Sequence, residues 1–312
     1  MIRRPLLVLL SLVTILAGAC GPLDTGKPAG GALPVVATFS VVADLVKNVG
    51  GEHVSVTTLV GPGLDTHTFT PTPADGAALA DTLLIFENGA DFETWLDDLY
   101  ASTGSQARRV ALSDGVELRA ADHAEAPGAE THGVGVYDPH IWHSVENASR
   151  MVRNVRDALI TADPGHKSDY EANAQAYTTE LQALDAWIFE QVQTLPVDRR
   201  KLVTTHDTLA YFGARYGFEI LGAVLPTSTE GASPSAQELA ALVDAVRAAG
   251  VPAVFSENVS SNSLINQVAT EAHVQVVASL FTDALGPEGS GAETYQDMLR
   301  YNVSTIVQAL GS

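Results

Sequence analysis

With 312 residues, 46% of them hydrophobic and 17% charged, the chain has the composition of a globular protein and is long enough for two ordinary domains or one large domain. Its 37 acidic and 17 basic residues give a formal net charge of −20, which argues against a nucleic-acid-binding protein because phosphates attract patches of Lys and Arg. The acidity is compatible with an extracytoplasmic protein or with one that handles cations, and solubility alone explains it equally well.

The N-terminus predicts a secretory signal peptide over residues 1–19. Arg3 and Arg4 form a short basic region, residues 5–17 are apolar, and residues 18–19 are small, as in cleaved signal sequences. The apolar run is shorter than the ~20 residues of a membrane-spanning helix, and no later stretch approaches that length.

Cys20 is the single cysteine of the chain, so no intramolecular disulfide can form. Its position directly after the signal core predicts a lipid attachment point, and ordinary cleavage near Ala19 is the alternative. The segment resembles a bacterial lipobox, with the departure that Leu16 lies four residues before the cysteine instead of three. We therefore interpret residues 20–33 as a lipid anchor and a flexible tether rich in Gly and Pro.

From residue 34 onward, short β-branched runs alternate with helical stretches, which is typical of βαβ units and a mainly parallel sheet. The first part of the chain predicts strands over 34–41, 54–60, 82–86 and 108–112, and helices over 41–50, 73–81 and 91–102. Residues 120–135 are polar, aperiodic and rich in Gly and Ala, which indicates a loop, and a helix is predicted over 144–161.

Apolar residues at three- and four-residue steps predict one unusually long helix over residues 167–195. The stripe consists of Tyr170, Ala174, Tyr177, Leu181, Leu184, Ile188, Val192 and Leu195. At 1.5 Å per residue such a helix is about 40 Å long, the length of a whole domain. It could therefore serve as a rigid strut between two lobes.

After Pro196 the alternation restarts. Strands are predicted over 201–206, 218–225, 252–256 and 274–280, and helices over 207–217, 233–250, 263–272 and 294–310. Ser233 is the predicted N-cap of the helix 233–250, with Pro234 in its first turn. The chain is thus predicted to be an α/β protein with two lobes, residues 34–163 and 197–312, which have mainly parallel sheets and are joined by a rigid helix over 164–196.

Four candidate ligand residues occupy positions where chemistry is commonly placed, beyond the carboxyl ends of parallel strands. His67 follows the strand 54–60, His206 ends the strand 201–206, and Asp283 follows the strand 274–280. His140 lies in an Asp-Pro-His turn before a helix. Three imidazoles and one carboxylate suit Zn²⁺, although each residue taken alone is more commonly an ordinary hydrogen-bonded or surface side chain.

Four segments carry a resemblance to a known family: DTHTFTPTPAD (65–75), DPHIW (138–142), VTTHDTLAYFGARYG (203–217) and LFTDALGPEGSGAETYQDMLRYN (280–302). They resemble the ligand segments of the zinc- and manganese-binding solute-binding proteins of bacterial ABC importers. The similarity covers essentially the whole mature chain and includes FSVVADL, STEGASPSAQELAALVDAV and FSENVSS. The fold of that family, two α/β lobes bridged by a long helix with the metal in the inter-lobe cleft, agrees with the predicted elements.

The resemblance implies a ligand set and a function. His67 and His140 would come from the first lobe, and His206 and Asp283 from the second. The third position is often Glu in manganese-type members and His in zinc-type members, so His206 favours Zn²⁺, with Mn²⁺ as the alternative. The chain would be a monomeric extracytoplasmic receptor, periplasmic or lipid-anchored at the membrane outer face, that delivers Zn²⁺ to the permease of an ABC importer.

Two departures from the family pattern bear on the site. Thr66 stands where the first motif usually has proline, so we expect a less rigid loop there. His143 stands where the family usually has leucine, and we expect it to be structural or to lie at the edge of the site, although a Trp-flanked His-x-x-His spacing can also bind a metal.

The remaining histidines and two acids receive weaker assignments. His123 and His132 lie in the polar loop 120–135, where zinc-type members often carry many histidines, and a solvated surface loop is the favoured interpretation. We expect surface or helix-end positions for the others, His53, His166 and His273. Asp207 and Glu257 are candidates for carboxylates that orient an imidazole, the alternatives being a helix N-cap and an ordinary strand-end acid.

Two other functions compete with that of a receptor. A zinc hydrolase keeps one coordination position open for water, whereas four protein ligands would close a tetrahedral site. The sequence also contains neither an HExxH nor a GxSxG motif. A surface adhesin remains compatible with a lipid anchor. Metal binding is expected to weaken below about pH 6, because histidine must be neutral to ligate.

Overall fold

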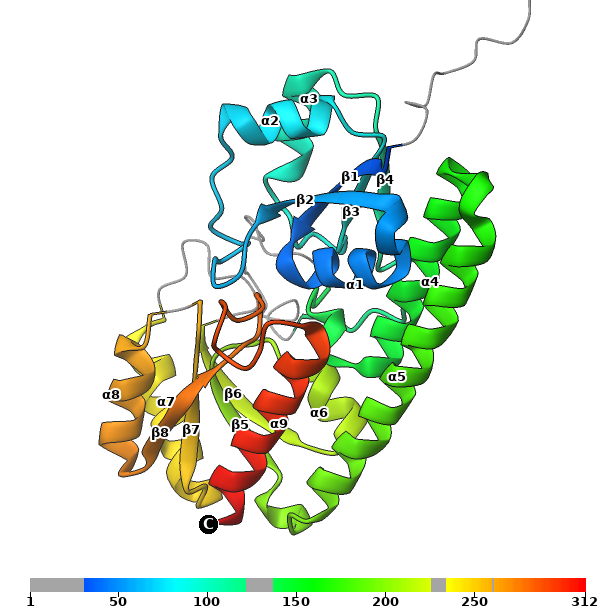
Figure 1. Ribbon diagram of the computed structural model, residues 1–312. Helices are drawn as coiled ribbons and strands as arrows, with labels where there is room; N and C mark the ends of the chain where they lie inside the picture. The colour runs from blue at the N-terminus through cyan, green and yellow to red at the C-terminus, as the bar shows by residue number, and fades with distance from the viewer. Residues whose placement is uncertain (1–30, 122–136, 226–233, 260) are drawn as a thin grey trace, which may run out of the picture. The chain divides into compact units, whose positions relative to one another are not determined.

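The computed structural model describes residues 31–121, 137–225, 234–259 and 261–312, which form alternating strands and helices (Figure 1). Within these ranges every ladder between named strands is parallel, which confirms an α/β fold with mainly parallel sheets. An isolated antiparallel bridge joins Ala120 to Tyr137. The predicted signal peptide, Cys20, His123 and His132 lie outside the described residues.

The first lobe is a four-stranded sheet in the order β2-β1-β3-β4. Its elements are β1 (Leu33–Phe39), α1 (Ser40–Gly50), β2 (Val54–Val60), α2 (Pro73–Ala80), β3 (Leu84–Glu87), α3 (Leu96–Thr103) and β4 (Arg108–Ala111). β1 and β3 are buried almost throughout, as inner parallel strands require, whereas β2 alternates because it is an edge strand. Figure 1 shows α1 on one face of the sheet and the pair α2 and α3 toward the other.

The start of α3 differs from the sequence prediction, which placed it at residue 91. Ala90 and Asp91 have positive φ values of 53° and 61°, which a helix cannot contain. The turn is fixed by the buried carboxylate of Glu93, which accepts hydrogen bonds from the backbone N–H groups of Asn88 and Gly89. The helix therefore begins at Leu96.

The helices α4 (Val145–Ala162) and α5 (Lys167–Gln193) pack side by side. The predicted apolar stripe of α5 is buried along its whole length, and 27 residues correspond to about 40 Å. This helix contacts α1 and α4 of the first lobe and also α6 and α9 of the second, so it runs along both lobes (Figure 1). Short 3₁₀ helices in the described ranges include Gly51–His53, Ile141–His143, Pro164–His166 and Val197–Arg199.

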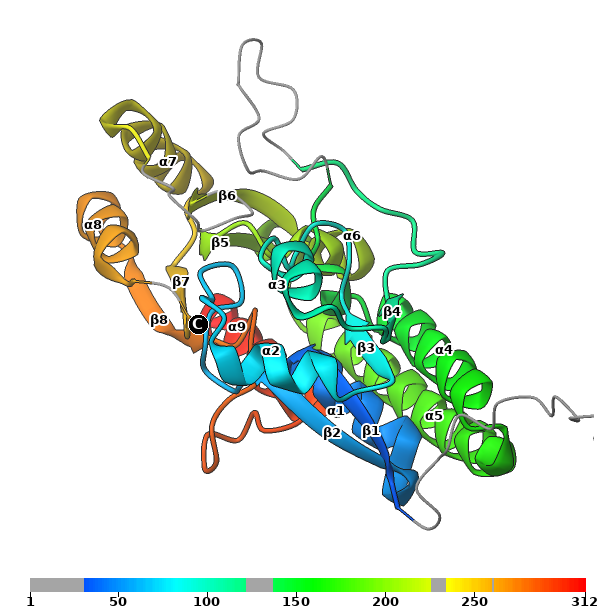
Figure 2. The same cartoon turned by 90° about the horizontal axis from the view of Figure 1, so that it is seen from above.

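The second lobe contains two parallel ladders, β5–β6 and β7–β8, with β5 packed beside β7. Its elements are β5 (Lys201–His206), α6 (Ala210–Tyr216), β6 (Glu219–Leu225), α7 (Ala236–Ala249), β7 (Ala253–Glu257), α8 (Ser263–Ala272), β8 (Gln275–Leu280) and α9 (Tyr295–Gly311). α7 and α8 pack together, and Figure 2 shows both at the outer side of these strands, away from α5.

The predicted N-cap of α7 at Ser233 is wrong. The helix begins at Ala236 with Ser235 as N-cap, because Ser235 and Glu238 form a reciprocal capping box. The Ser235 hydroxyl accepts the N–H of Glu238, and the Glu238 carboxylate accepts the N–H of Ser235. If Ser233 were the N-cap, Ala236 would occupy the third helical position. Alanine has no side-chain oxygen to accept the backbone N–H of the N-cap residue.

The hydrophobic core is continuous between the lobes. One cluster contains residues of β1, β3, α1, α4 and α5 together with residues of α6 and α9, whereas a smaller cluster fills the space between β5–β8 and the helices α7 and α8. No helix in the described ranges combines the length and apolarity needed to cross a membrane.

The buried stripe of α5 yields a stability prediction. Replacement of Leu184, which is fully buried, by Ala should lower the free energy of unfolding by roughly 2–5 kcal/mol because a cavity remains in the core. The exposed Glu190 on the same helix serves as the control, and Glu190→Ala should change it by less than about 0.5 kcal/mol. Urea denaturation measures the free energy of unfolding of both variants. Equal losses would contradict a stabilising role of the buried stripe.

Candidate metal centre

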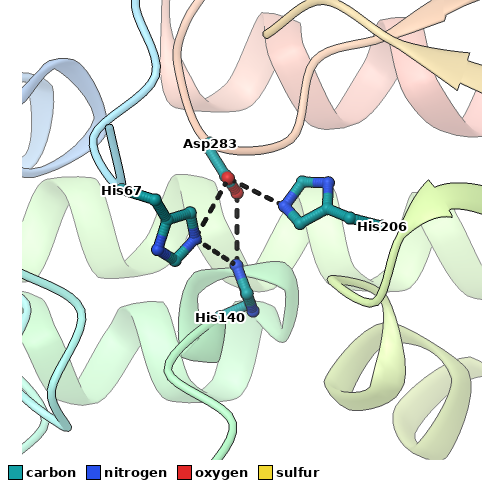
Figure 3. Close-up of side chains that lie close together, drawn as sticks. All are labelled: His67, His140, His206 and Asp283. Atoms are coloured by element: carbon teal, nitrogen blue, oxygen red, sulfur yellow. Dashed lines mark hydrogen bonds and ion pairs between the residues drawn. The ribbon is translucent and has the colours of Figure 1, made fainter. Parts of the chain in front are cut away.

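Four buried side chains converge at one point in the structure (Figure 3). His67, His140, His206 and Asp283 each offer one ligand atom, and these atoms all lie within 4.8 Å of one another. They come from four separate segments: the loop after β2, the turn before α4, the end of β5 and the loop after β8. The four positions proposed from the sequence are thus brought together by the fold.

His67 is held by the loop between β2 and α2. The Asp65 carboxylate accepts the backbone N–H of His67 at 2.8 Å, a local turn that fixes the chain direction. Thr66 is buried, and its carbonyl accepts the indole N–H of Trp95 at 3.0 Å. Hydrogen bonds thus hold a loop in which Thr66 replaces the usual proline. The imidazole lies edge-on to the ring of Phe92, 4.8 Å between centroids.

His140 is held by Asp138, a residue to which the sequence analysis gave no role. The Asp138 carboxylate accepts the backbone N–H of His140 at 2.9 Å and lies 2.7 Å from its Nδ1. The same Asp-x-His spacing occurs at His67, where the aspartate also accepts the backbone N–H of the histidine. This repeated spacing was the signal available in the sequence.

His206 and Asp283 meet at the carboxyl ends of the strands of the second lobe. His206 ends β5, and its Nε2 lies 2.9 Å from Asp283 Oδ2. Glu257 ends the adjacent strand β7, accepts the backbone N–H of His206 at 2.8 Å and lies 2.7 Å from its Nδ1. Thr282 donates its hydroxyl to the same carboxylate at 2.6 Å. Glu257 is therefore placed to orient the His206 ring.

Asp207 is buried next to His206, and its backbone N–H bonds the carbonyl of Leu225. The N-cap of α6 is Leu209, because the helix begins only at Ala210, so the alternative role of Asp207 as N-cap is wrong. The carboxylate that faces Nδ1 of His206 is that of Glu257.

The ring orientations point the Nε2 atoms toward the centre of the cluster. His67 Nε2 and His140 Nε2 lie 3.3 Å apart, and each lies 3.4 Å from an oxygen of Asp283 (Figure 3). Nδ1 of His140 and of His206 faces a carboxylate, which favours the tautomer with its proton on Nδ1 and the lone pair of a neutral ring on Nε2. Three Nε2 atoms and a carboxylate form a donor set that suits a divalent cation.

Buried charges shift the pKa values within the cluster. Burial disfavours imidazolium at His206, but the Glu257 and Asp283 carboxylates outweigh it and raise its pKa well above the ordinary value. At His140 burial is likewise outweighed, by Asp283 and Asp138, and the pKa is raised. Burial would raise the pKa of Asp283, but the imidazoles of His206 and His140 hold it well below its ordinary value. Protons on these imidazoles therefore compete with a cation for the Nε2 atoms.

The histidines without a proposed ligand role lie elsewhere. His143 is fully buried next to Trp142, and burial followed by the charge of His140 lowers its pKa to about 3, so it is neutral. It is not one of the four converging residues. His53 and His166 stack on one another with centroids 3.9 Å apart, near the start of α5, and His273 is exposed at the C-cap of α8.

Comparison with known proteins gives consistent matches over nearly the whole chain. Residues 35–309 match the family model described as ZnuA, zinc-uptake complex component A periplasmic. The manganese-binding lipoprotein MntA of Halalkalibacterium halodurans is 36% identical over 300 residues, 96% of each chain. The zinc-binding protein TroA of Treponema pallidum is 34% identical over 310 residues, again 96% of each chain.

Solved structures agree with these sequence matches. The periplasmic zinc-binding protein TroA of Treponema pallidum has a TM-score of 0.79 at 32% identity and covers 90% of this chain and 99% of its own. The manganese-bound periplasmic metal-binding protein of Candidatus Liberibacter asiaticus has a TM-score of 0.78 at 26% identity. The match covers 88% of this chain and 98% of that protein's chain. These likenesses confirm the two-lobed fold with a long helix.

The contact between Glu257 and His206 yields a first prediction for the site. Glu257→Gln keeps the size of the side chain but removes the charge that faces Nδ1, so the affinity for Zn²⁺ should fall by about 10- to 100-fold. Glu271→Gln, at an exposed position on α8, is the matched control and should leave the affinity unchanged. Competition with a chromophoric chelator measures both, and an unchanged affinity in Glu257→Gln would exclude an orienting role.

The raised pKa values of His140 and His206 yield a second prediction. Both rings keep their protons at pH values where an ordinary imidazole, with a pKa of about 6.5, is neutral, so a metal must displace these protons. Affinity for Zn²⁺ should therefore decrease as pH falls, and this decrease should begin above about pH 6.5. Where binding displaces two protons, the affinity should fall by up to about 100-fold per pH unit. Chelator competition at a series of pH values tests this dependence, and an affinity that stays constant between about pH 8 and 6 would contradict it.

Proposed function

This chain belongs to the ZnuA family, the periplasmic component A of zinc-uptake complexes, and we propose that Zn²⁺ is the ion that it binds. It is accordingly a metal-binding receptor of an ABC importer and not an enzyme, which removes the zinc hydrolase from consideration. The ion is the cargo of the protein, passed on to a membrane permease.

The observation that carries the proposal is the donor set. Three imidazole nitrogens and one carboxylate converge in a site where all four side chains are buried. Zn²⁺ prefers nitrogen with some oxygen, and four protein ligands complete the tetrahedron that it commonly adopts. His67, His140, His206 and Asp283 are the proposed ligands. Asp138 and Glu257 would fix the rings of His140 and His206 through Nδ1.

Mn²⁺ is a second candidate, supported by a different observation. The relatives MntA and the streptococcal PsaA are named as manganese-binding or manganese-transporting proteins, whereas TroA is named as zinc-binding. Mn²⁺ prefers more oxygen donors than this cluster provides, and the imidazole at position 206 favours Zn²⁺ for that reason.

The ligands are distributed so that a bound ion would connect the two lobes. His67 and His140 belong to the first lobe, and His206 and Asp283 to the second. We propose the boundaries 34–163 and 197–312 for the lobes and 164–196 for the connecting helix. Since the lobes also share one core cluster and the long α5, metal binding should shift them only slightly.

The mode of attachment follows from the N-terminal sequence. MntA and PsaA are named lipoproteins, which supports lipidation of Cys20 after removal of residues 1–19. The mature protein would then be a monomer on the outer face of the cell membrane, tethered by residues 20–33 and within reach of a permease.

Competition titration of the metal-free protein tests the choice of ion. Zn²⁺ should bind one tight site and Mn²⁺ should bind far more weakly, because the site offers three imidazoles. His206→Ala should lower the affinity for Zn²⁺ by at least 100-fold, since a ligand is lost and the Asp283 carboxylate loses its nearest partner.

The control for this titration is His273→Asn, which alters an exposed histidine and keeps a residue tolerant of positive φ. Its affinity should equal that of the unaltered protein. If the protein binds Mn²⁺ as tightly as Zn²⁺ or more tightly, Mn²⁺ becomes the proposed ion in place of Zn²⁺. Absence of any tight site would refute the proposed ligand set for both ions.

A further inference from the structure

A separate cavity of ≈ 800 Å³ lies beside the N-terminal end of α4. Its wall is formed by residues 115–120, by the first turns of α4 and by α6. This volume falls within the range of small-molecule sites, about 300–1,000 Å³. None of the four proposed metal ligands lines it.

The charge of the cavity is opposite to that of the protein. Four arginines line it, Arg119, Arg150, Arg153 and Arg215, out of only 17 basic residues in a chain with net charge −20. The lining carboxylates are Glu117 and Glu146, and Glu146 is paired with Arg215, which also bonds Asp185. In the described part of the chain no carboxylate lies within ion-pair distance of the other three arginines.

Local geometry leaves room for the guanidinium of one of these arginines and fixes the backbone of another. Gly115 has a φ of 75°, and the guanidinium of Arg150 lies so close that a Cβ there would be 2.4 Å from Nη2. Any side chain at position 115 would therefore displace it. The backbone N–H of Arg119 donates to the Tyr211 hydroxyl at 2.9 Å, which in turn donates to the carbonyl of Asp138 at 2.9 Å.

The helix terminus adds to the positive potential. α4 is 18 residues long, and its N-cap Ser144 lies in the cavity wall. The N-terminus of a helix carries a partial positive charge, which favours a nearby anion. Arginine guanidinium groups bind carboxylate and phosphate oxygens in pairs, with two parallel N–H···O bonds.

We propose that this cavity binds a small anion that carries carboxylate or phosphate groups. Arg119, Arg150 and Arg153 would supply the donors, and the polar wall of Ser144 and Tyr211 would complete the site. We choose a soluble anion over a membrane headgroup because the arginines line a concave cavity, and because Arg119 and Arg150 are exposed the experiment below includes vesicles.

Isothermal titration calorimetry of the metal-free protein with citrate, and separately with pyrophosphate, tests the proposal. One of these probes, or both, should bind at one site per chain. Arg150→Gln and Arg153→Gln should each weaken that binding by about tenfold or more, since each removes a charge-assisted hydrogen bond. The stronger probe identifies whether carboxylate or phosphate is preferred.

Arg156→Gln is the matched control, because Arg156 lies on the same helix, is paired with Asp157 and does not line the cavity. Its binding should stay within twofold of the unaltered protein, and circular dichroism should show that all three variants are folded. Three results would overturn the proposal: no saturation by either probe up to about 10 mM, an equal loss in Arg156→Gln, or binding to anionic phosphatidylglycerol vesicles with none to the soluble probes.

Discussion

Buried carboxylates that face imidazoles are the constraint on which the site depends. Asp138, Glu257 and Asp283 are each at most 1% exposed, and each lies within 3 Å of a ring nitrogen of His140 or His206. An isolated carboxylate in such surroundings costs several kcal/mol, so the cluster requires positive charge. Protons on the imidazoles supply this charge, as the raised pKa values of His140 and His206 indicate, and a divalent cation bound at the Nε2 atoms would supply it in their place.

The fold meets this constraint by bringing strand ends together. In parallel sheets the carboxyl ends of the strands share one edge, and here His206 ends β5 while His67 and Asp283 lie in the loops after β2 and β8. Hydrogen bonds then join the segment of His140 to that of Asp283: Trp142 donates its indole N–H to the carbonyl of Thr282 at 2.9 Å, and Tyr295 donates to the carbonyl of Trp142 at 2.6 Å. The geometry of the cluster is therefore set by both lobes and by α5 between them.

Much of this architecture could be predicted from the sequence because it depends on local patterns. The stripe of α5 and the helix α8 follow from hydrophobic periodicity. The four converging residues were singled out by their places near strand ends and by the family resemblance that short motifs carry. The start of α3 could not be predicted, because Glu93 fixes the preceding turn through a carboxylate buried only in the folded chain. The capping box at Ser235 is readable from its spacing to Glu238, whereas the Ser-Pro pair at 233–234 favours an earlier start of the helix.

Other features depend on tertiary contacts that no local pattern contains. Arg119, Arg153 and Arg215 lie far apart in the sequence, and only the packing of α4 and α6 against residues 115–120 brings them to one cavity. The geometry of the four proposed ligands, on which metal selectivity also depends, is likewise set by tertiary packing.

X-ray absorption spectroscopy of the zinc-loaded protein tests the proposed ligand set most directly. Four nitrogen or oxygen neighbours at about 2.0–2.1 Å, with the outer-shell scattering of three imidazoles, are the predicted result. A coordination shell with fewer than three imidazoles, or with six oxygen-rich neighbours at longer distances, would contradict a site built from His67, His140, His206 and Asp283.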